Sequence, residues 1–203
     1  MEAVFDSFSI EGELNGPTNM ARDLELLDAA LQGASGCRVY FWDGVWVSLG
    51  RNQAPSESLV EGFERWVGRP TGGGAVLHGH DITVGIAMPY EGRSVKAAYQ
   101  MVVTPLVAAM RQCGLPARLS TELPTLSQND CFAGSSPYDA IHERSGAKLC
   151  GCALRMVRGA ALLQASIPYM EPLIEPSLAI RGAVRHPVTE WHYAKLVKAL
   201  AGG

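Results

Sequence analysis

The chain has 203 residues, 47% of them hydrophobic, and a chain of this size buries roughly 70% of its unfolded surface, so we expect one domain over residues 1–203. Seventeen basic and twenty acidic side chains give a net charge of −3, which excludes the basic surface typical of nucleic-acid binding. No apolar run is long enough for a membrane span and the acidic N-terminus lacks a signal peptide, so we expect a cytoplasmic protein without nucleic-acid or membrane partners.

The first two predicted elements are a helix and a β-hairpin. Residues 18–33 carry apolar side chains at helical spacing behind a Thr18 or Asn19 cap. Residues 37–53 contain two runs of β-branched and aromatic residues on either side of Asp43-Gly44, a dipeptide that favours a type I′ turn. The turn signal predicts that the two runs pair with each other.

Helices and strands continue to alternate in the middle of the chain. A short helix is expected from Ser56, and a strand or strand pair over residues 75–89. The glycine run before residue 75 would then join a helix to a strand. A longer helix is expected over residues 94–114, where Pro105 removes one backbone donor and should kink it.

The last third of the chain begins with an irregular stretch, residues 120–137, rich in Ser, Thr, Pro, Asn and Gly. Residues 138–169 predict two or three strands with turns at Ser145-Gly146 and Arg158-Gly159, and a final helix is expected from a Thr189 cap. Together these elements predict an α+β fold, with a largely antiparallel or mixed β-sheet flanked by helices.

A run of three glycines is the most unusual local feature of the sequence, within "RPTGGGAVLHGHD" at residues 69–81. Its spacing matches neither a dinucleotide-binding fingerprint nor a phosphate-binding Walker loop, and an isolated glycine run is about as often a flexible turn as a site. However, Arg69 precedes the run and His78 follows it. Exposed backbone amides beside a guanidinium suit a carboxylate, carbonyl or phosphate ligand.

Four segments together resemble one protein family. "RPTGGGAVLH" resembles the R-R-x-x-G-G-G-x-V-x-H-D signature of the family that joins lipoate-protein ligases, octanoyltransferases and, more distantly, biotin-protein ligases. "NMARDLELL" is similar to the N-terminal helix of that family, "RVYFWDGVWVSLGRNQ" to its hairpin and "GAKLCGCALR" to its lysine-bearing strand. The four segments occur in the family's order over residues 18–167, which makes a chance resemblance improbable.

The resemblance implies a biotin/lipoyl protein ligase-like fold, related to class II synthetases, and an enzyme that attaches an octanoyl or lipoyl group to a lysine of a lipoyl carrier domain. Carriers of this kind are the 2-oxoacid dehydrogenase E2 component and the glycine cleavage H protein. By the same resemblance, the residues expected to bind substrate are Arg69, Thr71, Gly72, Gly73, Gly74, Ala75, His78, Gly151, Ala153 and Gln164.

Lys148 corresponds to the family's invariant lysine, which the resemblance assigns to polarising the acyl carbonyl and stabilising the developing oxyanion. Most strand lysines are simply solvated, but this one begins an otherwise apolar run, which indicates a partly buried cation. In an extended strand it shares a face with Cys150 and Cys152. Two cysteines without a second pair fall short of a zinc site, so we expect small lining residues and no metal.

Cys131 is the candidate nucleophile. The five cysteines are unpatterned and predict free thiols in a reducing compartment, where a lone cysteine is most often structural. Here, however, Cys131-Phe132 followed by Tyr138 resembles the loop of the cysteine octanoyltransferases, whose cysteine is the nucleophile. The resemblance implies that the acyl group is carried as a thioester on Cys131. A nearby Lys148 would then lower the pKa of the thiol.

Several departures from the family pattern bear on the type of reaction. A glycine, Gly68, replaces one of the paired arginines, two residues separate His78 from Asp81, and Gln164-Ala165 stands where the family has His-Gly. The short tail argues against a C-terminal accessory domain. These features favour an acyltransferase that needs no cofactor, or a ligase that needs a second subunit. Two alternatives stay open: an ATP- and Mg²⁺-dependent lipoate-protein ligase acting through lipoyl-AMP, and a noncatalytic member of the family.

Overall fold

The structure of the protein is a computed structural model that describes residues 5–121, 129–185, 188–189 and 191–202. Its strands are β1 (Ser7–Leu14), β2 (Gly36–Trp42), β3 (Trp46–Leu49), β4 (Trp66–Gly68), β5 (Val76–His78), β6 (Asp81–Tyr90), β7 (Ala117–Leu119), β8 (Ala140–His142), β9 (Lys148–Val157) and β10 (Gly159–Pro168). Its helices are α1 (Gly16–Leu31), α2 (Pro55–Ser58), α3 (Val95–Gln112) and α4 (Tyr193–Leu200), with short 3₁₀ turns η1 (Cys131–Ala133) and η2 (Pro176–Leu178).

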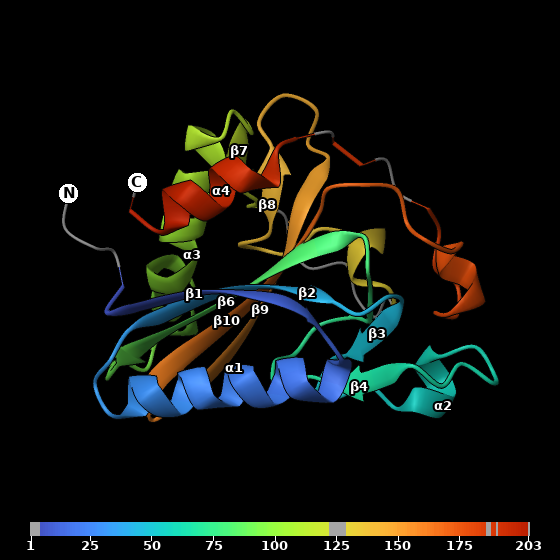
Figure 1. Cartoon of the computed structure of the whole chain (residues 1–203), viewed down its shortest axis with the longest axis horizontal. Coiled ribbons are helices and arrows are strands. Elements are labelled where there is room, and N and C mark those ends of the chain that lie inside the picture. The colour runs from blue at the N-terminus through green and yellow to red at the C-terminus, as the bar shows by residue number, and fades with distance from the viewer. Residues whose placement is uncertain (1–4, 122–128, 186–187, 190, 203) are drawn as a thin grey trace.

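Two sheets organise the molecule. The larger sheet has the strand order β1-β2-β6-β10-β9-β8-β7, and the smaller has the order β4-β3-β5. Only the β1–β2 and β3–β4 ladders among the described residues are parallel. Helix α1 lies along one face of the larger sheet, and α3 and α4 cover the opposite face (Figure 1). This arrangement confirms the predicted α+β class with a mixed sheet flanked by helices.

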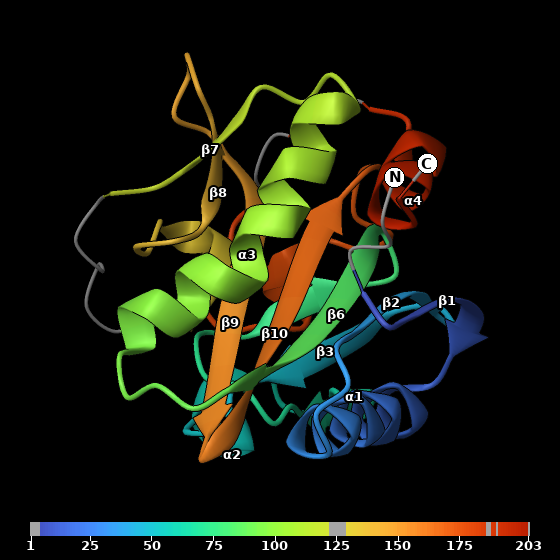
Figure 2. The same ribbon diagram turned by 90° about the vertical axis from the view of Figure 1, so that its left-hand side faces the viewer.

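The main core lies between the larger sheet and α3, where buried side chains from β6 and β10, such as Ile86 and Leu163, meet Leu106 and Met110 of the helix. Figure 2 shows α3 running across β9 and β10. A smaller cluster on the other face packs Leu27 of α1 against the sheet. None of the helices in the described part of the chain combines the length and the apolar character that a membrane crossing requires.

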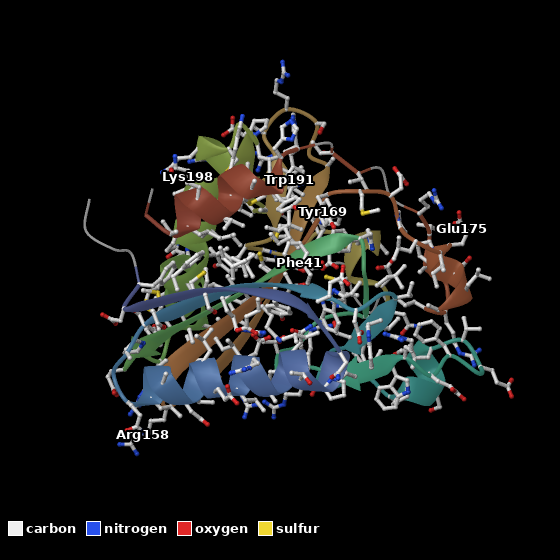
Figure 3. All side chains as sticks on the ribbon, in the orientation of Figure 1. Phe41, Arg158, Tyr169, Glu175, Trp191 and Lys198 are labelled. Atoms are coloured by element: carbon white, nitrogen blue, oxygen red, sulfur yellow. The ribbon has the colours of Figure 1, made fainter. Side chains whose placement is uncertain are left out.

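The C-terminal segment returns to the sheet through an aromatic cluster. Tyr169, which follows β10, contacts Phe41 of β2 and Tyr193 of α4, with ring centroids 6.4 and 5.2 Å away respectively. Trp191 donates its ring N–H to the carbonyl oxygen of Pro168 at 3.0 Å. Figure 3 shows Phe41, Tyr169 and Trp191 one above another between the sheet and α4. These contacts hold the last helix in place against the sheet.

Helix α1 begins earlier than the sequence predicted. Its N-cap is Asn15, whose side chain accepts a hydrogen bond from the backbone of Thr18 at 2.9 Å, and not Thr18 or Asn19. Asn19 is fully buried and donates to the carbonyl oxygens of Leu14 and Phe41. It therefore ties the start of the helix to the strands on either side. Strand β1, whose side chains are mostly exposed, was not predicted.

The predicted β-hairpin is wrong, although both of its strands exist. Strand β2 pairs with β1 and β6 in the larger sheet, whereas β3 pairs with β4 and β5 in the smaller sheet. The Asp43-Gly44 turn, with Gly44 at φ +86°, directs the chain from one sheet into the other. A local turn signal fixes where a strand ends but does not identify its partner.

The short helix predicted from Ser56 is a single turn, α2, whose N-cap Ala54 makes no side-chain cap. Residues 66–68 form strand β4, so the glycine run joins two strands and not a helix to a strand. Residues 75–89, predicted as a strand or a strand pair, contain two strands, β5 and β6. They belong to different sheets, and Gly79 between them has a φ of +103°.

The remaining elements follow the prediction more closely. Ser94 caps α3, which continues through Pro105. Strands β8, β9 and β10 are all present, with glycines at positive φ at the two predicted turns, Gly146 and Gly159. The last helix begins at Tyr193, not at a Thr189 cap. Of the predicted irregular stretch, residues 122–128 lie outside the described part of the chain.

Candidate active site

Two adjoining hollows meet at Cys131. The inner cavity, with about 340 Å³ of empty space that includes part of its open mouth, is bordered by α1, both sheets and the glycine loop, which we define as residues 69–75. Its lining residues are Met20, Tyr40, Trp42, Ser48, Arg69, Val76, His78, Thr83, Cys131, Gly151, Ala153, Gln164, Ala165 and Ser166. The outer groove, with about 780 Å³ of empty space, is lined by small and polar residues that include Gly73, Gly74, Ser135 and Cys131. Cys131 is therefore accessible from both sides.

Arg69 braces the glycine loop from within. The side chain is 6% exposed, and each of its three nitrogens donates to a protein oxygen. It binds the carbonyl oxygens of Gly72 and Gly74 at 2.5 and 2.7 Å and that of Ser48 at 2.9 Å. Arg69 does line the inner cavity, as predicted, but its hydrogen bonds hold the loop in shape and leave no donor free for an anion.

The three glycines differ in what their backbone requires. Gly73 has a φ of +88°, which side-chain-bearing residues rarely adopt. At Gly74, an added Cβ would lie 2.9 Å from the backbone nitrogen of Cys131, whereas at Gly72 it would meet nothing within 4 Å. An added Cβ at Gly50, across the loop, would lie only 1.9 Å from the carbonyl oxygen of Gly73. Glycine is therefore needed at residue 73 for its positive φ, and at residues 50 and 74 because a Cβ there would lie too close to neighbouring backbone atoms.

A backbone ladder joins the glycine loop to the Cys131 segment. The backbone N–H of Cys131 donates to the carbonyl oxygen of Ala75 at 2.9 Å, and that of Ala75 donates to Asn129 at 2.5 Å. This short parallel bridge places Cys131 at the start of η1, where the Asp130 side chain accepts from the N–H of Phe132. The position of the thiol is thus fixed by the same loop that borders the inner cavity.

Lys148 reaches Cys131 from the start of β9. Its Nζ lies 3.5 Å from Cys131 Sγ and donates to the carbonyl oxygens of Cys131 and Gly134 at 2.6 and 3.1 Å. It also forms an ion pair of 2.8 Å with Asp139, in which the two side chains are 7% and 1% exposed. The sequence brought Cys131 and Lys148 into one hypothesis, and the structure places them in contact. Asp139 was not predicted.

The pKa of Cys131 differs from the expectation. Burial raises the pKa of the thiol, and although Lys148 and Arg69 lower it, Asp139 adds to the rise and the net direction is upward. The prediction that Lys148 lowers the pKa of the thiol is therefore correct for the contribution of Lys148, but burial outweighs that contribution. Burial also opposes the charged form of Lys148, but Cys131 and Asp139 more than offset this and raise the pKa of the ammonium group.

Ser48, His78 and Asp81 form a buried hydrogen-bonded chain on the wall of the inner cavity. His78 Nε2 lies 2.8 Å from Ser48 Oγ, and His78 Nδ1 lies 2.8 Å from Asp81 Oδ2. Burial would raise the pKa of Asp81, but the hydrogen bonds and charge of His78 hold it well below its usual range. Asp81 reaches His78 despite the two intervening residues. Because Ser48 also contacts Arg69, this chain supports the glycine loop.

A second buried chain ties the other side of the glycine loop to α1. Thr71 Oγ1 donates to Gln164 Oε1 at 2.6 Å, and Gln164 Nε2 donates to Asp23 at 2.5 Å. Asp23 in turn forms a fully buried ion pair of 2.6 Å with Arg38 and accepts from Tyr40. Gln164, which stands where the family has histidine, thus carries the connection from the loop to α1.

Every residue predicted to bind substrate lies around these two hollows. The inner cavity is lined by Arg69, His78, Gly151, Ala153 and Gln164, the outer groove by Gly73 and Gly74, and hydrogen bonds connect Thr71, Gly72 and Ala75 to them. At Gly151, an added Cβ would lie 3.0 Å from Cys131 Sγ. The thiol therefore sits directly against the backbone of β9.

The predicted shared face of β9 is only partly correct. The sulfur atoms of Cys150 and Cys152 are 3.6 Å apart and both residues belong to the main core, although Cys152 also lines the outer groove. The side chain of Lys148 instead turns toward the side of β9 that Gly151 faces. A Cβ added to Gly151 would lie 3.6 Å from Lys148 Cε. No group of three or more His, Cys, Asp and Glu side chains is placed to hold a metal ion within the described ranges.

The family is indicated by comparison with known sequences. A family model described as the lipoyl protein ligase A/B catalytic domain matches residues 15–174. The chain is 31% identical over 216 residues to octanoyltransferase LipM of Kyrpidia tusciae, covering 94% of this chain and 77% of that protein. It is 30% identical over 168 residues to octanoyltransferase LipM of Macrococcus caseolyticus, covering 73% of this chain and 60% of that protein.

Solved structures indicate the same fold. A T. acidophilum protein with bound lipoic acid superposes with a TM-score of 0.79 at 21% identity, covering 98% of this chain and 83% of that one. A lipoate-protein ligase A bound with ATP gives a TM-score of 0.77, also at 21% identity and with the same coverage. At this level of identity the likeness is one of fold.

Proposed function

Because the chain belongs to the family of lipoyl protein ligase A/B catalytic domains, we propose that it transfers an octanoyl or lipoyl group to a lysine of a lipoyl carrier domain through a thioester on Cys131. The single observation that carries this proposal is the contact of 3.5 Å between Cys131 Sγ and Lys148 Nζ, at the point where the inner cavity meets the outer groove. The likeness to octanoyltransferases supports the same reaction.

In the first half of the reaction, the Cys131 thiolate attacks the carbonyl carbon of an acyl thioester donor. The new C–S bond forms as the donor thiolate leaves, and that thiolate takes up the proton lost by Cys131. Lys148 is placed to stabilise the thiolate and then the oxyanion. An ammonium group has three N–H donors, so Lys148 exchanges one of its two carbonyl contacts for the acyl oxygen at this stage.

In the second half, the amine of the carrier lysine attacks the acyl-Cys131 carbonyl through the outer groove. An amide bond forms, the C–S bond breaks, and the amine proton returns to the Cys131 sulfur. The acceptor we propose is a lipoyl domain of the 2-oxoacid dehydrogenase E2 or glycine cleavage H type. Since both halves exchange one acyl bond for another, the transfer needs no ATP or other cofactor.

The inner cavity suits an unsubstituted acyl chain. Its polar lining residues have hydrogen-bond partners within the protein, as Ser48 has in His78 and Gln164 has in Thr71, so they offer little to a polar ligand. Apolar surface is supplied by Met20, Val76 and other lining residues. An alkyl tail gains free energy from leaving water without needing hydrogen bonds. We propose that the acyl tail occupies this cavity.

The glycine loop favours a second candidate, an ATP- and Mg²⁺-dependent ligase that holds lipoyl-AMP, because glycine-rich backbone suits phosphate groups. Against it, the two buried cations beside the loop, Arg69 and Lys148, both donate to protein oxygens and not outward. A nucleotide phosphate would have to displace these contacts. We therefore place the ligase reaction second.

The test is intact-mass spectrometry of the protein after incubation with an octanoyl thioester of acyl carrier protein and no acceptor. We expect one added octanoyl group that neutral hydroxylamine removes, since hydroxylamine cleaves thioesters but not amides. Adding an apo lipoyl domain of the E2 or H-protein type should then convert it to the octanoyl-lysine form. A Cys131→Ser variant should lose the adduct, and the control Cys113→Ser should keep it.

A parallel reaction contains octanoate or lipoate with ATP and Mg²⁺ in place of the thioester donor. Turnover only in this reaction, with Cys131 unmodified, would reject the transferase and support the ligase. No turnover in either reaction would support a noncatalytic member of the family and reject both enzymatic proposals.

A further inference from the structure

Asp139 is the counter-ion of Lys148 and is buried beside it. Asp139 Oδ2 lies 2.8 Å from Lys148 Nζ, with the carboxylate 1% and the lysine side chain 7% exposed. Two buried charges in contact are far more stable than either charge alone in the same place. The pair therefore restricts where the ammonium group can lie.

The carboxylate also joins two backbone segments around the thiol. It accepts a hydrogen bond from the backbone N–H of Ser136 at 2.7 Å and another from that of Cys152 at 2.9 Å. The first belongs to the segment that follows Cys131, and the second belongs to β9, the strand that carries Lys148. The Asp139 side chain thus fixes the positions of the nucleophile segment, strand β9 and the Lys148 ammonium group relative to one another.

The backbone before Asp139 is unusual. Tyr138 has a φ of +76°, the one positive φ at a non-glycine residue in the described chain, a conformation that is strained for a residue with a side chain. Its ring stacks on Tyr99 of α3 with centroids 5.0 Å apart, and its N–H donates to the carbonyl oxygen of Ser120. Tyr138 is therefore strained but held by these contacts, and it directly precedes Asp139, whose side chain binds Lys148.

We infer that Asp139 is a positioning residue for acyl transfer: it holds Lys148 Nζ at Cys131 Sγ and fixes the segment between the nucleophile and β9. This inference rests on the proposed reaction at Cys131. Asp139 contacts neither the thiol nor either hollow in the described structure, so it acts through Lys148. No signal in the sequence singles it out, because its role depends on contacts made across the fold.

Asp139 has a second effect that separates this role from a purely structural one. The charged groups that act on the Cys131 thiol are Lys148 and Arg69, which lower its pKa, and Asp139, which raises it together with burial. Removing the negative charge of Asp139 should therefore make the thiol ionise at lower pH. The same change should leave Lys148 near the thiol but no longer held at one fixed position, which should slow acyl transfer. A reactive thiol and a slow enzyme are thus expected in one variant.

The experiment compares Asp139→Asn and Asp139→Glu with the control Glu143→Gln, which removes a half-exposed carboxylate from the surface pair with Arg111. All are made in a Cys113→Ser background so that the partly exposed Cys113 does not react. Two quantities are measured: the pH dependence of Cys131 alkylation by iodoacetamide, and the rate of thioester formation from the octanoyl carrier donor.

For Asp139→Asn we expect alkylation at lower pH than in the parent and thioester formation about 10–100-fold slower, which is the loss typical of removing the partner that orients a metal-binding side chain. For Asp139→Glu, which keeps the charge, we expect an unmoved alkylation profile and a reduced kcat with unchanged KM. Glu143→Gln should match the parent in both measurements.

A parent rate of thioester formation in Asp139→Asn would overturn the inference. If Asp139→Asn does not fold, Asp139→Glu decides: a raised KM with unchanged kcat would overturn it. If the parent forms no thioester, the proposed function fails, and an alkylation profile of Asp139→Asn that equals the parent's would then overturn the inference that Asp139 acts on Lys148 and Cys131.

Discussion

The Nζ atom of Lys148 lies 3.5 Å from the Sγ atom of Cys131, although seventeen residues separate them in the chain. The contact is made because η1 and the start of β9 are held together by buried hydrogen bonds, with Asp139 between them. In this contact the pKa of the Lys148 ammonium group is raised, and burial raises the pKa of the Cys131 thiol.

Removing Lys148 should cost both stability and activity. Lys148→Met leaves Asp139 buried without its cation, and breaking such a pair typically costs about 3–5 kcal/mol in the free energy of unfolding. Loss of oxyanion stabilisation should lower the rate of acyl transfer about 10²–10³-fold. Urea unfolding and a transfer assay measure the two effects.

In Lys148→Met/Asp139→Asn, part of the lost stability should return, but the activity should not. Recovery of both would show that Lys148 acts only through stability.

Alkylation of Cys131 should be slower near neutral pH than that of an unstructured cysteine. The thiolate is the reactive form, and a raised pKa leaves less thiolate at a given pH, so the rate should rise with pH through a midpoint above the ordinary cysteine value. Lys148→Met removes a group that lowers the pKa, so its midpoint should lie higher still. Iodoacetamide kinetics followed by mass spectrometry measure both. A faster reaction than that of the free amino acid would contradict a raised pKa for Cys131.

Substitutions in the glycine loop should differ sharply between neighbouring positions. Gly72→Ala should be tolerated, because an added Cβ meets nothing there. Gly74→Ala should displace the backbone of Cys131, and Gly73→Val should be strained by the positive φ. We expect the last two variants to lose most thioester formation and the first to keep it. Equal activity in all three variants would show that the loop need not approach Cys131 closely.

The buried pair below the loop should contribute more to stability than a surface pair on the same helix. Asp23→Ala removes the fully buried partner of Arg38, which keeps only the partly exposed Glu11, and should lower the free energy of unfolding by up to about 3–5 kcal/mol. Glu25→Ala removes an exposed partner of Arg22 and should cost at most about 1 kcal/mol. Urea denaturation of both variants gives the comparison, and similar losses would indicate that the buried chain is not a support for the loop.

Much of the fold could be predicted because its local signals were strong. The helices α1 and α3, and strands β8 to β10, have the expected patterns of apolar residues and turn glycines. Sheet partners could not be predicted in the same way. Asp43-Gly44 is a strong turn signal, yet the strands that flank it pair with segments far away in the sequence. Strand pairing depends on burial against the whole fold, which a local dipeptide does not report.

The candidate site was predicted to a similar extent. Residue types and family-like segments indicated Cys131, Lys148 and the glycine loop, and the structure brings them together. Asp139 and Ser48 were missed because nothing distinguishes them from ordinary loop and strand residues until the fold places them beside Lys148 and His78. The net direction of the Cys131 pKa could not be predicted either, since it depends on how far burial outweighs the neighbouring cations.

The backbone bridge at Ala75 also bears on motion within the site. Cys131 and Asn129 are both bonded to Ala75, which follows directly on Gly74, so the nucleophile segment cannot swing away without breaking two hydrogen bonds to the glycine loop. Segments joined in this way open as one cooperative unit. Any fluctuation that widens the entrance to the inner cavity at this point therefore also displaces the thiol, which makes access and reactivity a single conformational variable.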